Sequence, residues 1–391
     1  MQTNCELLLC IVDNEASDSF RVVNQDFEIN YVDGSHSIGE YISEVFGIGN
    51  VRLENTTMGL GLDTDIPYGL VGVGYAVNEA SVADRIVYPN LPIVMREEGH
   101  IATNAYSLWL NDLDAGTGSI LFGGIDTDKY EGSLTRLSVK EDSQTGTFSS
   151  FIVELTSLQA HSSSGSDTLP SSSYPVDVVL DSGTTYSYIP QELAEEVWRE
   201  VGAQYISQHE IAAIPCGMAS SSGYFTFGFG GEGGPSIKVG MDELVIVPPS
   251  GGYNDNDICP FGIQNSTAKP YLLGDTFLRS AYVVYDLENN EIGMAATDFN
   301  STSSNIVPFP SRGATIPSST PASNQSSPPS GTSGSPDFSA SDGFNDRSGN
   351  GNGNGNGDSA AMSLGLDTTQ FMVMGASMFF MMLGGGMFVL F

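Results

Sequence analysis

Residues 178–190 read VVLDSGTTYSYIP, an apolar run that ends at Asp181 and is followed by a small hydroxyl residue, a glycine and two threonines. Such a run predicts a buried strand that delivers a carboxylate, and Gly183 leaves room for backbone amides and substrate to approach it. Ser182 and Thr184 supply hydroxyls that can hold the carboxylate. The stretch points to one half of a two-carboxylate site, although Asp-Ser-Gly alone is more often an ordinary turn.

The composition is that of a strongly acidic chain of 391 residues, long enough for two packed lobes and a tail. Lys and Arg total 13 and Asp and Glu total 47, so the formal net charge is −34. This charge repels nucleic acid and anionic lipid headgroups, which argues against either as a partner. It gives a weak long-range bias toward basic polypeptides, although it fits equally well a surface that only keeps a secreted protein soluble.

The chain from about residue 26 to residue 299 has the pattern of a β protein. Short alternating or apolar runs are separated by Gly, Asp and Asn turns, and LENNEIG is typical of a hairpin. Helical patterns are few, and the clearest is QELAEEVWREVGAQYISQ after Pro190. Its apolar residues near one face are Leu193, Val197, Val201 and Tyr205. The sequence therefore predicts a mostly antiparallel, all-β fold with minor helix.

Cysteines and sequons favour a secretory route. The cysteines are Cys5, Cys10, Cys216 and Cys259, and the N-x-S/T sequons begin at Asn55, Asn265, Asn300 and Asn324. An even cysteine count with several sequons is typical of an oxidising, glycosylating compartment. The absence of a CxxC pair and the scarcity of His argue against a zinc site. Pairing within each half, Cys5–Cys10 and Cys216–Cys259, is the simplest of three possible connectivities.

The C-terminal part changes character. Residues 311–358 are dominated by Ser, Pro, Gly, Thr and Asn, which predicts a disordered spacer. Residues 371–391 carry no charge and just reach the length of a spanning helix. Small residues near Asp358, a polar spacer and an apolar tail follow the order of a glycolipid (GPI) attachment signal, which we favour over a tail anchor. On this interpretation Asp358 or a neighbour is the attachment residue, and the anchored protein has no spanning helix.

Several stretches together resemble the pepsin-like (family A1) aspartic proteases, and most closely their fungal GPI-anchored branch, the yapsins. DSGTT at 181–185 is similar to the second catalytic loop of that family, and INYVDGS at 29–35 to the flap hairpin over the cleft. GLVGVGY at 69–75 and YLLGDTFLRSAYVVYD at 271–286 resemble its two hydrophobic-hydrophobic-glycine elements, one in each lobe. The resemblance extends over roughly residues 20 to 300 and implies a bilobal pepsin-like fold.

The resemblance also assigns roles to residues. It implies that Asp181 belongs to a pair of aspartates that share one proton: one activates a water, and the other protonates the carbonyl oxygen of the peptide. The resemblance further implies that no metal, cofactor or covalent intermediate takes part. The residues expected to contact substrate are Tyr31, Asp33, Gly34, Ser182, Gly183, Thr184 and Thr185. A half-buried strand aromatic for Tyr31, a plain turn for Asp33 and core packing for Thr185 are the alternatives.

The partner of Asp181 is missing from the sequence. Upstream of the flap the aspartates are Asp13, Asp18 and Asp26, and none is followed by the small residue and glycine that the first catalytic loop needs. Asp114, in DAGTG, lies after the flap and leads into SILFGG, a pattern typical of a hairpin turn. We therefore expect an incomplete first lobe and a polypeptide that is inactive alone. A gene model that starts at an internal methionine is the simplest explanation; a true loss that leaves a pseudo-enzyme, and a homodimer that pairs two copies of Asp181, are the others.

The two ends of the chain and its cysteines fit this interpretation. The first residues, MQTNCELLLCIVDNEASD, lack a basic region and make a poor signal peptide. CELLLC resembles the short disulfide loop that follows the first catalytic loop in yapsins, and Cys216 and Cys259 match the second-lobe disulfide.

The predicted organisation has four parts: a remnant of the N-terminal lobe at 1–138, a C-terminal lobe at 139–308, a disordered spacer at 309–358, and an attachment signal or anchor at 359–391. We expect a monomeric aspartic endopeptidase on the outer cell surface, tied to the membrane by a glycolipid and acting on polypeptides. The alternatives are a non-catalytic protein that grips extended peptides by strand addition, and a structural wall glycoprotein.

Overall fold

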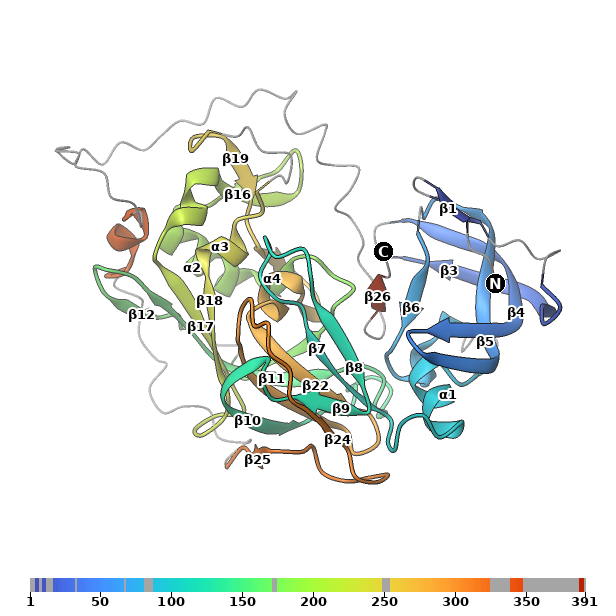
Figure 1. The fold of residues 1–391 in the computed structure, drawn as a ribbon. Coiled ribbons are helices and arrows are strands. Elements are labelled where there is room, and N and C mark those ends of the chain that lie inside the picture. The colour runs from blue at the N-terminus through green and yellow to red at the C-terminus, as the bar shows by residue number, and fades with distance from the viewer. Residues whose placement is uncertain are drawn as a thin grey trace.

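The structure is a computed structural model of the whole chain. It describes residues 4–6, 9–11, 17–31, 34–66, 68–80, 87–170, 174–247, 254–323, 338–346 and 387–389. These residues form a mostly β molecule in which a smaller first lobe lies beside a larger second lobe and its central sheet (Figure 1). No helix among them is long and apolar enough to cross a membrane.

The first lobe is a three-stranded antiparallel sheet with one helix packed against it. Its strands are β3 (Arg21–Asn30), β4 (His36–Ile48) and β5 (Val51–Thr64), paired in that order. Leu53 of β5 is fully buried against Leu91 and Met95 of α1 (Leu91–Glu97), so the helix covers part of the sheet. Asn90 and Pro92 stand at the start of this helix, where Pro costs no hydrogen bond.

A central six-stranded sheet follows, in the order β25-β10-β23-β22-β7-β8. Its strands are β7 (Ala105–Trp109), β8 (Ser119–Phe122), β10 (Tyr130–Ser138), β22 (Ala281–Asp286), β23 (Glu291–Thr297) and β25 (Ser319–Pro321). β22 and β23 form the hairpin predicted from LENNEIG, and Asn290 in its turn has a φ of 54°, which Asn tolerates better than most residues. Every residue of β22 is buried, because strands cover it on both sides and side chains on both faces.

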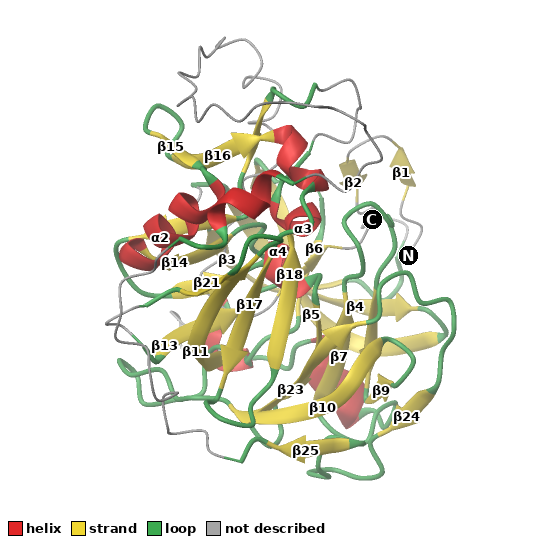
Figure 2. Ribbon diagram, turned by 90° about the vertical axis from the view of Figure 1, so that its left-hand side faces the viewer, coloured by secondary structure: helices red, strands yellow, loops and turns green. Residues whose placement is uncertain are grey.

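The second lobe is an eight-stranded sheet with short helices at one end, as Figure 2 shows. Its strands are β11 (Ile152–His161), β12 (Ser166–Thr168), β13 (Val176–Leu180), β14 (Ser187–Pro190), β17 (Tyr224–Phe229), β18 (Ser236–Gly240), β20 (Ile263–Ser266) and β21 (Tyr271–Leu273). A smaller sheet adds β15 (Gln204–Ile206), β16 (Ile211–Pro215) and β19 (Ile258–Pro260). The large apolar core between these layers includes Phe225, Phe227, Phe229 and Phe277.

The helix predicted after Pro190 is present but shorter than its pattern. α2 spans Gln191–Val201 and buries Leu193, Val197 and Val201 as expected. Gly202 then adopts a left-handed conformation with a φ of 73° and ends the helix. Tyr205 therefore lies in β15, where it is half exposed and stacks on Trp198 rather than extending the helical face. Two further short helices, α3 (Met241–Leu244) and α4 (Asp275–Leu278), complete this lobe.

Part of the expected spacer at 309–358 is ordered, and here the structure differs from the prediction. Just before it, β24 (Ile306–Pro308) pairs with β9 (Gly124–Asp126), and within it β25 adds a parallel edge to β10. Phe309 and Ile316 are buried in a core cluster with Trp109 and Tyr282. A second ordered segment, residues 338–346, docks on the second lobe and is described below. A few buried aromatic and aliphatic side chains supply the apolar contacts that the average composition conceals.

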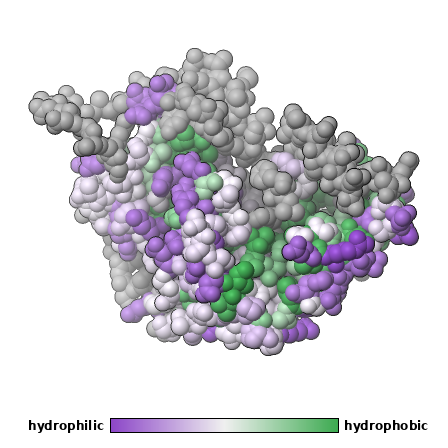
Figure 3. Space-filling model, in the orientation of Figure 1, coloured by the Kyte–Doolittle hydropathy of each residue, from purple (hydrophilic) through white to green (hydrophobic). Residues whose placement is uncertain are grey.

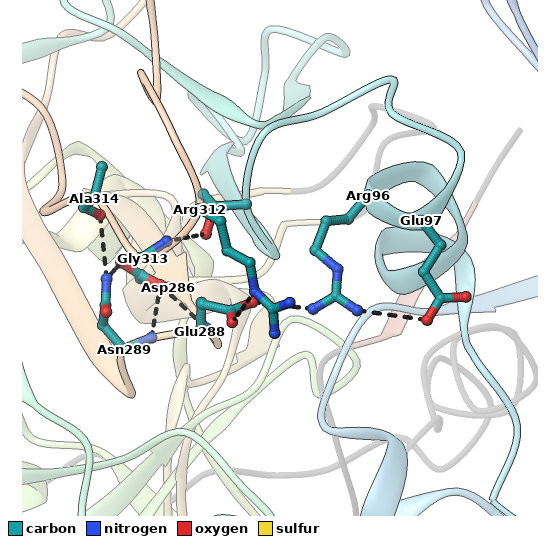
Figure 4. A network of polar contacts seen from close by, with 9 residues as sticks. Arg96, Glu97, Asp286, Glu288, Asn289, Arg312, Gly313 and Ala314 are labelled. Carbon is teal, nitrogen blue, oxygen red and sulfur yellow. Dashed lines mark hydrogen bonds and ion pairs between the residues drawn. The ribbon is translucent and has the colours of Figure 1, made fainter.

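The two lobes are linked by charged side chains. Arg96 of α1 donates to Glu288 at 3.0 Å, and Arg312 of the C-terminal segment donates to the same carboxylate at 2.6 Å (Figure 4). Burial raises the pKa of Glu288, but the hydrogen bonds from the two guanidinium groups outweigh it and leave the pKa below its ordinary value. Glu288 thus joins the first lobe, the β22–β23 turn and the C-terminal extension at one point.

Short strands form two further pairs in the part of the chain that the structure describes. β1 (Asn4–Glu6) and β2 (Leu9–Ile11) pair so that Cys5 stands opposite Cys10, and β6 (Leu70–Gly72) pairs with β26 (Met387–Val389). The rest of the apolar tail at 371–391 lies outside the described residues. On the face seen in Figure 3, hydrophobic surface is gathered in the middle, and the outer edges are mainly hydrophilic.

Candidate active site

Asp181 is positioned by two parallel strands. The apolar run before it forms β13, whose register pairs Val178 with Tyr271 and Leu180 with Leu273 of β21. The Asp181 backbone N–H continues this ladder and donates to the carbonyl of Leu273 at 3.0 Å. Because β13 lies inside the sheet, with β11 on its other side, the carboxylate is delivered from a rigid, buried strand.

The loop after the strand holds both oxygens of this carboxylate. The Gly183 N–H donates to Oδ1 at 2.9 Å, and the Thr184 hydroxyl donates to Oδ2 at 2.7 Å. The residue is 4% exposed. Each oxygen retains acceptor capacity after these bonds, so it can still engage a water, a proton or a second carboxyl group. This explains chemically why a hydroxyl residue and a glycine follow the aspartate.

The acidity of Asp181 is set by competing effects. Burial disfavours the charged form and raises the pKa of this carboxyl, while the hydrogen bonds from Thr184 and Gly183 act in the opposite direction without cancelling it. A carboxyl whose pKa is raised can exchange protons in mild acid rather than staying ionised. That property is needed for general acid–base work.

A second chain segment, which begins at Gly274, is hydrogen-bonded to the loop that follows Asp181. The N–H groups of Asp275 and Thr276 donate to the carbonyls of Thr184 at 2.8 Å and Thr185 at 3.1 Å. A Cβ atom at Gly274 would lie 2.2 Å from the Thr184 oxygen and 2.4 Å from the Tyr186 oxygen. Both are backbone atoms, so the close approach requires a glycine here.

Three charged residues near the Gly274 segment were not among the predicted site residues. Asp275, whose Oδ1 is buried, and Arg279 lie one helical turn apart, and the Arg279 Nε is 3.9 Å from the Glu243 Oε2. Burial raises the pKa of Asp275 to about 7; Arg279 lowers it in part, and the charge of Asp181 raises it further. Burial likewise raises the pKa of Glu243 to about 7. In the sequence, an aspartate and an arginine interrupt the apolar run LLGDTFLR, but this pattern alone does not place them beside Asp181.

The residues expected to contact substrate fall into two groups. Ser182, Gly183, Thr184 and Thr185 share the loop of Asp181 in the second lobe, and Ser182, Gly183 and Thr185 are partly exposed. Tyr31 and Gly34 lie in the β3–β4 turn of the first lobe, where the Tyr31 N–H donates to the carbonyl of Ser35 at 2.8 Å. The hairpin expected from INYVDGS is therefore present, while its role as a flap stays a prediction. Asp33 lies outside the described residues.

The structure also describes some of the predicted cysteines and sequons, and the turn at Asp114. Cys216, which directly follows β16, forms a disulfide with Cys259 of β19, whereas the side chains of Cys5 and Cys10 lie outside the described residues. Asn55 and Asn300 are exposed and Asn265 is partly so; Asn324 and Asp358 lie outside the described residues. Asp114 is exposed in the turn between β7 and β8, where its N–H donates to Asp112 at 2.8 Å, in agreement with the turn that the sequence predicted.

Comparison with known proteins gives a consistent result. A sequence model described as "Eukaryotic aspartyl protease" matches residues 2–297. The chain is 42% identical over 323 residues to "Probable aspartic-type endopeptidase OPSB" of Arthroderma benhamiae, covering 80% of this chain and 64% of that protein. It is 33% identical over 289 residues to "Secreted aspartic protease 8" of Candida albicans, covering 74% and 64%.

The fold has a solved counterpart. The crystal structure of aspartic proteinase from Irpex lacteus superposes with a TM-score of 0.59 at 18% identity, covering 74% of this chain and 86% of that one. This likeness concerns the fold alone. The chain spans 64% of the length of the Arthroderma relative.

Proposed function

The chain belongs to the eukaryotic aspartyl protease family, and on that premise we propose that it is the Asp181-bearing part of an aspartic endopeptidase that hydrolyses peptide bonds. The observation that carries this proposal is the environment of Asp181. Its two oxygens accept from Gly183 and Thr184, and burial raises its pKa. This is the state required of a carboxyl group that exchanges a proton during the reaction.

The reaction needs a second carboxyl group opposite Asp181. One carboxylate must take a proton from the attacking water while another group gives a proton to the carbonyl oxygen. The sequence contains one D-[ST]-G motif, at 181–183. We therefore expect the polypeptide of these 391 residues to be inactive alone, and we expect a second such loop to restore activity when it is placed beside the first lobe.

A chimera tests both halves of this proposal. An N-terminal segment carrying an apolar-apolar-D-[ST]-G loop is fused ahead of the chain, and cleavage of a basic fluorogenic peptide is followed between pH 3 and 7, about the range in which paired carboxyls titrate. We expect activity in acid from the chimera and none from the chain itself. Asp181→Asn in the chimera should lower kcat/KM by at least about 100-fold, because it removes an acid–base group. Asp114→Asn, in an exposed turn, is the matched control and should change little.

Two results would contradict the proposal. Cleavage by the 391-residue chain that Asp181→Asn abolishes would mean that a second carboxyl is already supplied by this chain. Activity of the chimera that survives Asp181→Asn would remove Asp181 from the reaction. The inhibitor pepstatin separates either outcome from a contaminating protease of another class.

A second candidate function is the binding of extended peptides without cleavage. The observations that favour it are the single D-[ST]-G loop and the paired strands β3 and β4, because main-chain pairing at a strand edge needs no catalysis. Titration of an uncleavable basic peptide, followed by fluorescence anisotropy, distinguishes the candidates. Binding by the chain at micromolar peptide, with no gain of cleavage in the chimera, would favour it over the protease.

We further propose that the protein acts on the outer cell surface, held by a glycolipid near Asp358, with basic polypeptides as its substrates. The exposed sequons at Asn55 and Asn300 and the Cys216–Cys259 disulfide support a secretory route. The order of small residues, spacer and apolar tail supports attachment. Appending residues 347–391 to a secreted reporter should anchor it, and phosphatidylinositol-specific phospholipase C should release it; a reporter that resists release contradicts the glycolipid.

A further inference from the structure

Residues 338–346, FSASDGFND, form a short docked segment that we call the strap. Phe344 of the strap is 1% exposed, and its ring stacks on Phe225 of β17 with centroids 5.5 Å apart. A Cβ atom at Gly223 would lie 2.2 Å from the Phe344 ring, so the glycine makes the space that this ring fills. The second lobe therefore carries a fitted pocket for an aromatic side chain of the chain's own C-terminal part.

Serine side chains of the second lobe hold the strap backbone around that pocket. Ser162 and Ser164 donate to the carbonyls of Ala340 and Ser339, each at 2.6 Å, and Ser221 donates to the carbonyl of Phe344 at 2.5 Å. The Gly343 N–H donates back to the Ser164 hydroxyl at 2.9 Å. The strap contains a short 3-10 helix, Ser341–Asn345, and several of its backbone groups are thus paired with the second lobe, as buried backbone requires.

Carboxylates complete the contact. Asp167 of β12 accepts from the Ala340 N–H at 2.8 Å, and the Ser341 hydroxyl donates to Glu200 of α2 at 2.9 Å. Asp167 is 5% exposed and Glu200 is 1% exposed. The guanidinium of Arg199 lies over the Phe338 ring, 5.3 Å from its centroid. The groove therefore has an aromatic pocket, a serine rim and an acidic wall.

We propose that this groove is a docking site for the strap, which fixes the C-terminal chain to the second lobe in acid and releases it as the pH rises through neutrality. Figure 1 places the strap, drawn in orange-red, on the side of the second lobe that faces away from β3–β5. This inference does not depend on the proposed function.

The pH response follows from Glu200 and its neighbours. Burial raises the pKa of Glu200 to about 7; Ser341 lowers it in part, and Asp167 and Glu196 raise it further. The charged groups facing Glu200 from β12 and α2 are thus acidic, with Arg199 turned toward Phe338. The strap lies against Glu200, which is 1% exposed while Ser341 contacts it, so undocking returns this carboxyl to water and favours its ionised form. Docking is therefore favoured in acid, and it loses favour as the pH rises through about 7.

Hydrogen–deuterium exchange of the full chain tests the docking. Exchange of amides 339–344 is compared with the intrinsic rate at each pH, and peptides from β17 report whether the lobe itself stays folded. We expect protection at pH 5.5 that falls by roughly tenfold at pH 8. Phe344→Ala should lose at least about 100-fold of the protection while β17 stays protected, because the pocket loses its ring. Asn345→Ala, exposed on the same turn, should change nothing.

Glu200→Gln separates the pH response from the docking. An amide keeps the shape and cannot ionise, so protection of the strap should remain at pH 8. A wild-type strap that exchanges at the intrinsic rate at pH 5.5 would overturn the docking, and an equal pH response in the Glu200→Gln variant would overturn the release. Protection that falls on dilution of the protein would show that the strap of a second copy fills the groove, which also contradicts the proposal.

Discussion

At the scale of single residues, Gly274 is the position where one methyl group should disturb the Asp181 loop most. The added Cβ would meet the carbonyl oxygens of Thr184 and Tyr186, and neither can move without breaking the hydrogen bonds that join the two segments. We expect Gly274→Ala to lower the free energy of unfolding by about 3 kcal/mol or more, measured by urea denaturation. Gly47→Ala in β4, whose Cβ would have a nearest neighbour 4.0 Å away, is the control and should cost less than about 1 kcal/mol. Equal effects would contradict the steric argument.

The charge of Asp181 should also be visible at Asp275. Burial is the largest cause of the raised pKa of Asp275, and the charge of Asp181 adds to it. Asp181→Asn removes that charge, so the pKa of Asp275 should move down from about 7 but stay above its ordinary value, because burial persists. Titration of the side-chain carboxyl carbons by NMR measures this directly. An unchanged Asp275 titration would mean that the two carboxyls do not interact.

Among the residues of the candidate site, some could be predicted from the sequence and others could not. The loop at 181–185 was predictable because apolar run, aspartate, hydroxyl and glycine follow one another in the chain. Asp275, Arg279 and Glu243 were not, because they reach the loop from α4 and from α3, and only the folded chain brings them near Asp181. A motif of consecutive residues can be recognised in the sequence, whereas a network of residues from separate elements leaves no comparable pattern.

At the scale of elements, Arg96 of α1 and Arg312 of the C-terminal extension both bind Glu288, and we expect them to contribute unequally to stability. The Arg96 side chain is 20% exposed and the Arg312 side chain 68% exposed, while both donate to Glu288. An exposed ion pair contributes little because water competes for it. We expect Arg96→Ala to lower the free energy of unfolding by about 1–3 kcal/mol and Arg312→Ala by less than about 1 kcal/mol.

A double-mutant cycle with Glu288→Ala checks this ranking by urea denaturation. The coupling between Arg96 and Glu288 should exceed the coupling between Arg312 and Glu288. Added salt should weaken the Arg312 term more, because its charge is the more exposed. A larger coupling for the exposed arginine would contradict the assignment of Arg96 as the principal link to the first lobe.

The elements differ in how well the sequence predicted them. α2 was predictable because Leu193, Val197 and Val201 recur at helical spacing. The prediction for Tyr205 was wrong because it extended the helix past Gly202, the residue that ends it. The strap and β25 were missed because they lie in a stretch rich in Ser, Gly and Pro. Their stability comes from single buried rings and from serines of another element, and no periodic pattern marks such contacts.

At the scale of the whole molecule, the buried carboxyls predict that the protein is more stable in mild acid than at neutral pH. Burial raises the pKa values of Glu200, Glu243 and Asp275 to about 7 each. A carboxyl with a raised folded-state pKa binds more protons folded than unfolded, so its full contribution is present below the unfolded pKa and is lost as the pH rises through about 7. The net charge of −34 acts in the same direction, because self-repulsion falls as carboxylates are protonated.

The lowered pKa values of Glu288, Glu44 and Asp65 oppose this trend. Their effect is confined to pH values below the ordinary carboxyl range. We therefore expect Tm to be highest near about pH 4–5 and to fall by roughly 5–15 °C toward pH 8, measured by calorimetry at constant ionic strength. The variant carrying Glu200→Gln, Glu243→Gln and Asp275→Asn should have a flatter profile, whereas Glu195→Gln, exposed on α2, should reproduce the wild-type profile. A Tm that rises from pH 5 to pH 8 would show that these carboxyls are already ionised in the folded chain. It would also remove the electrostatic basis for the release of the strap.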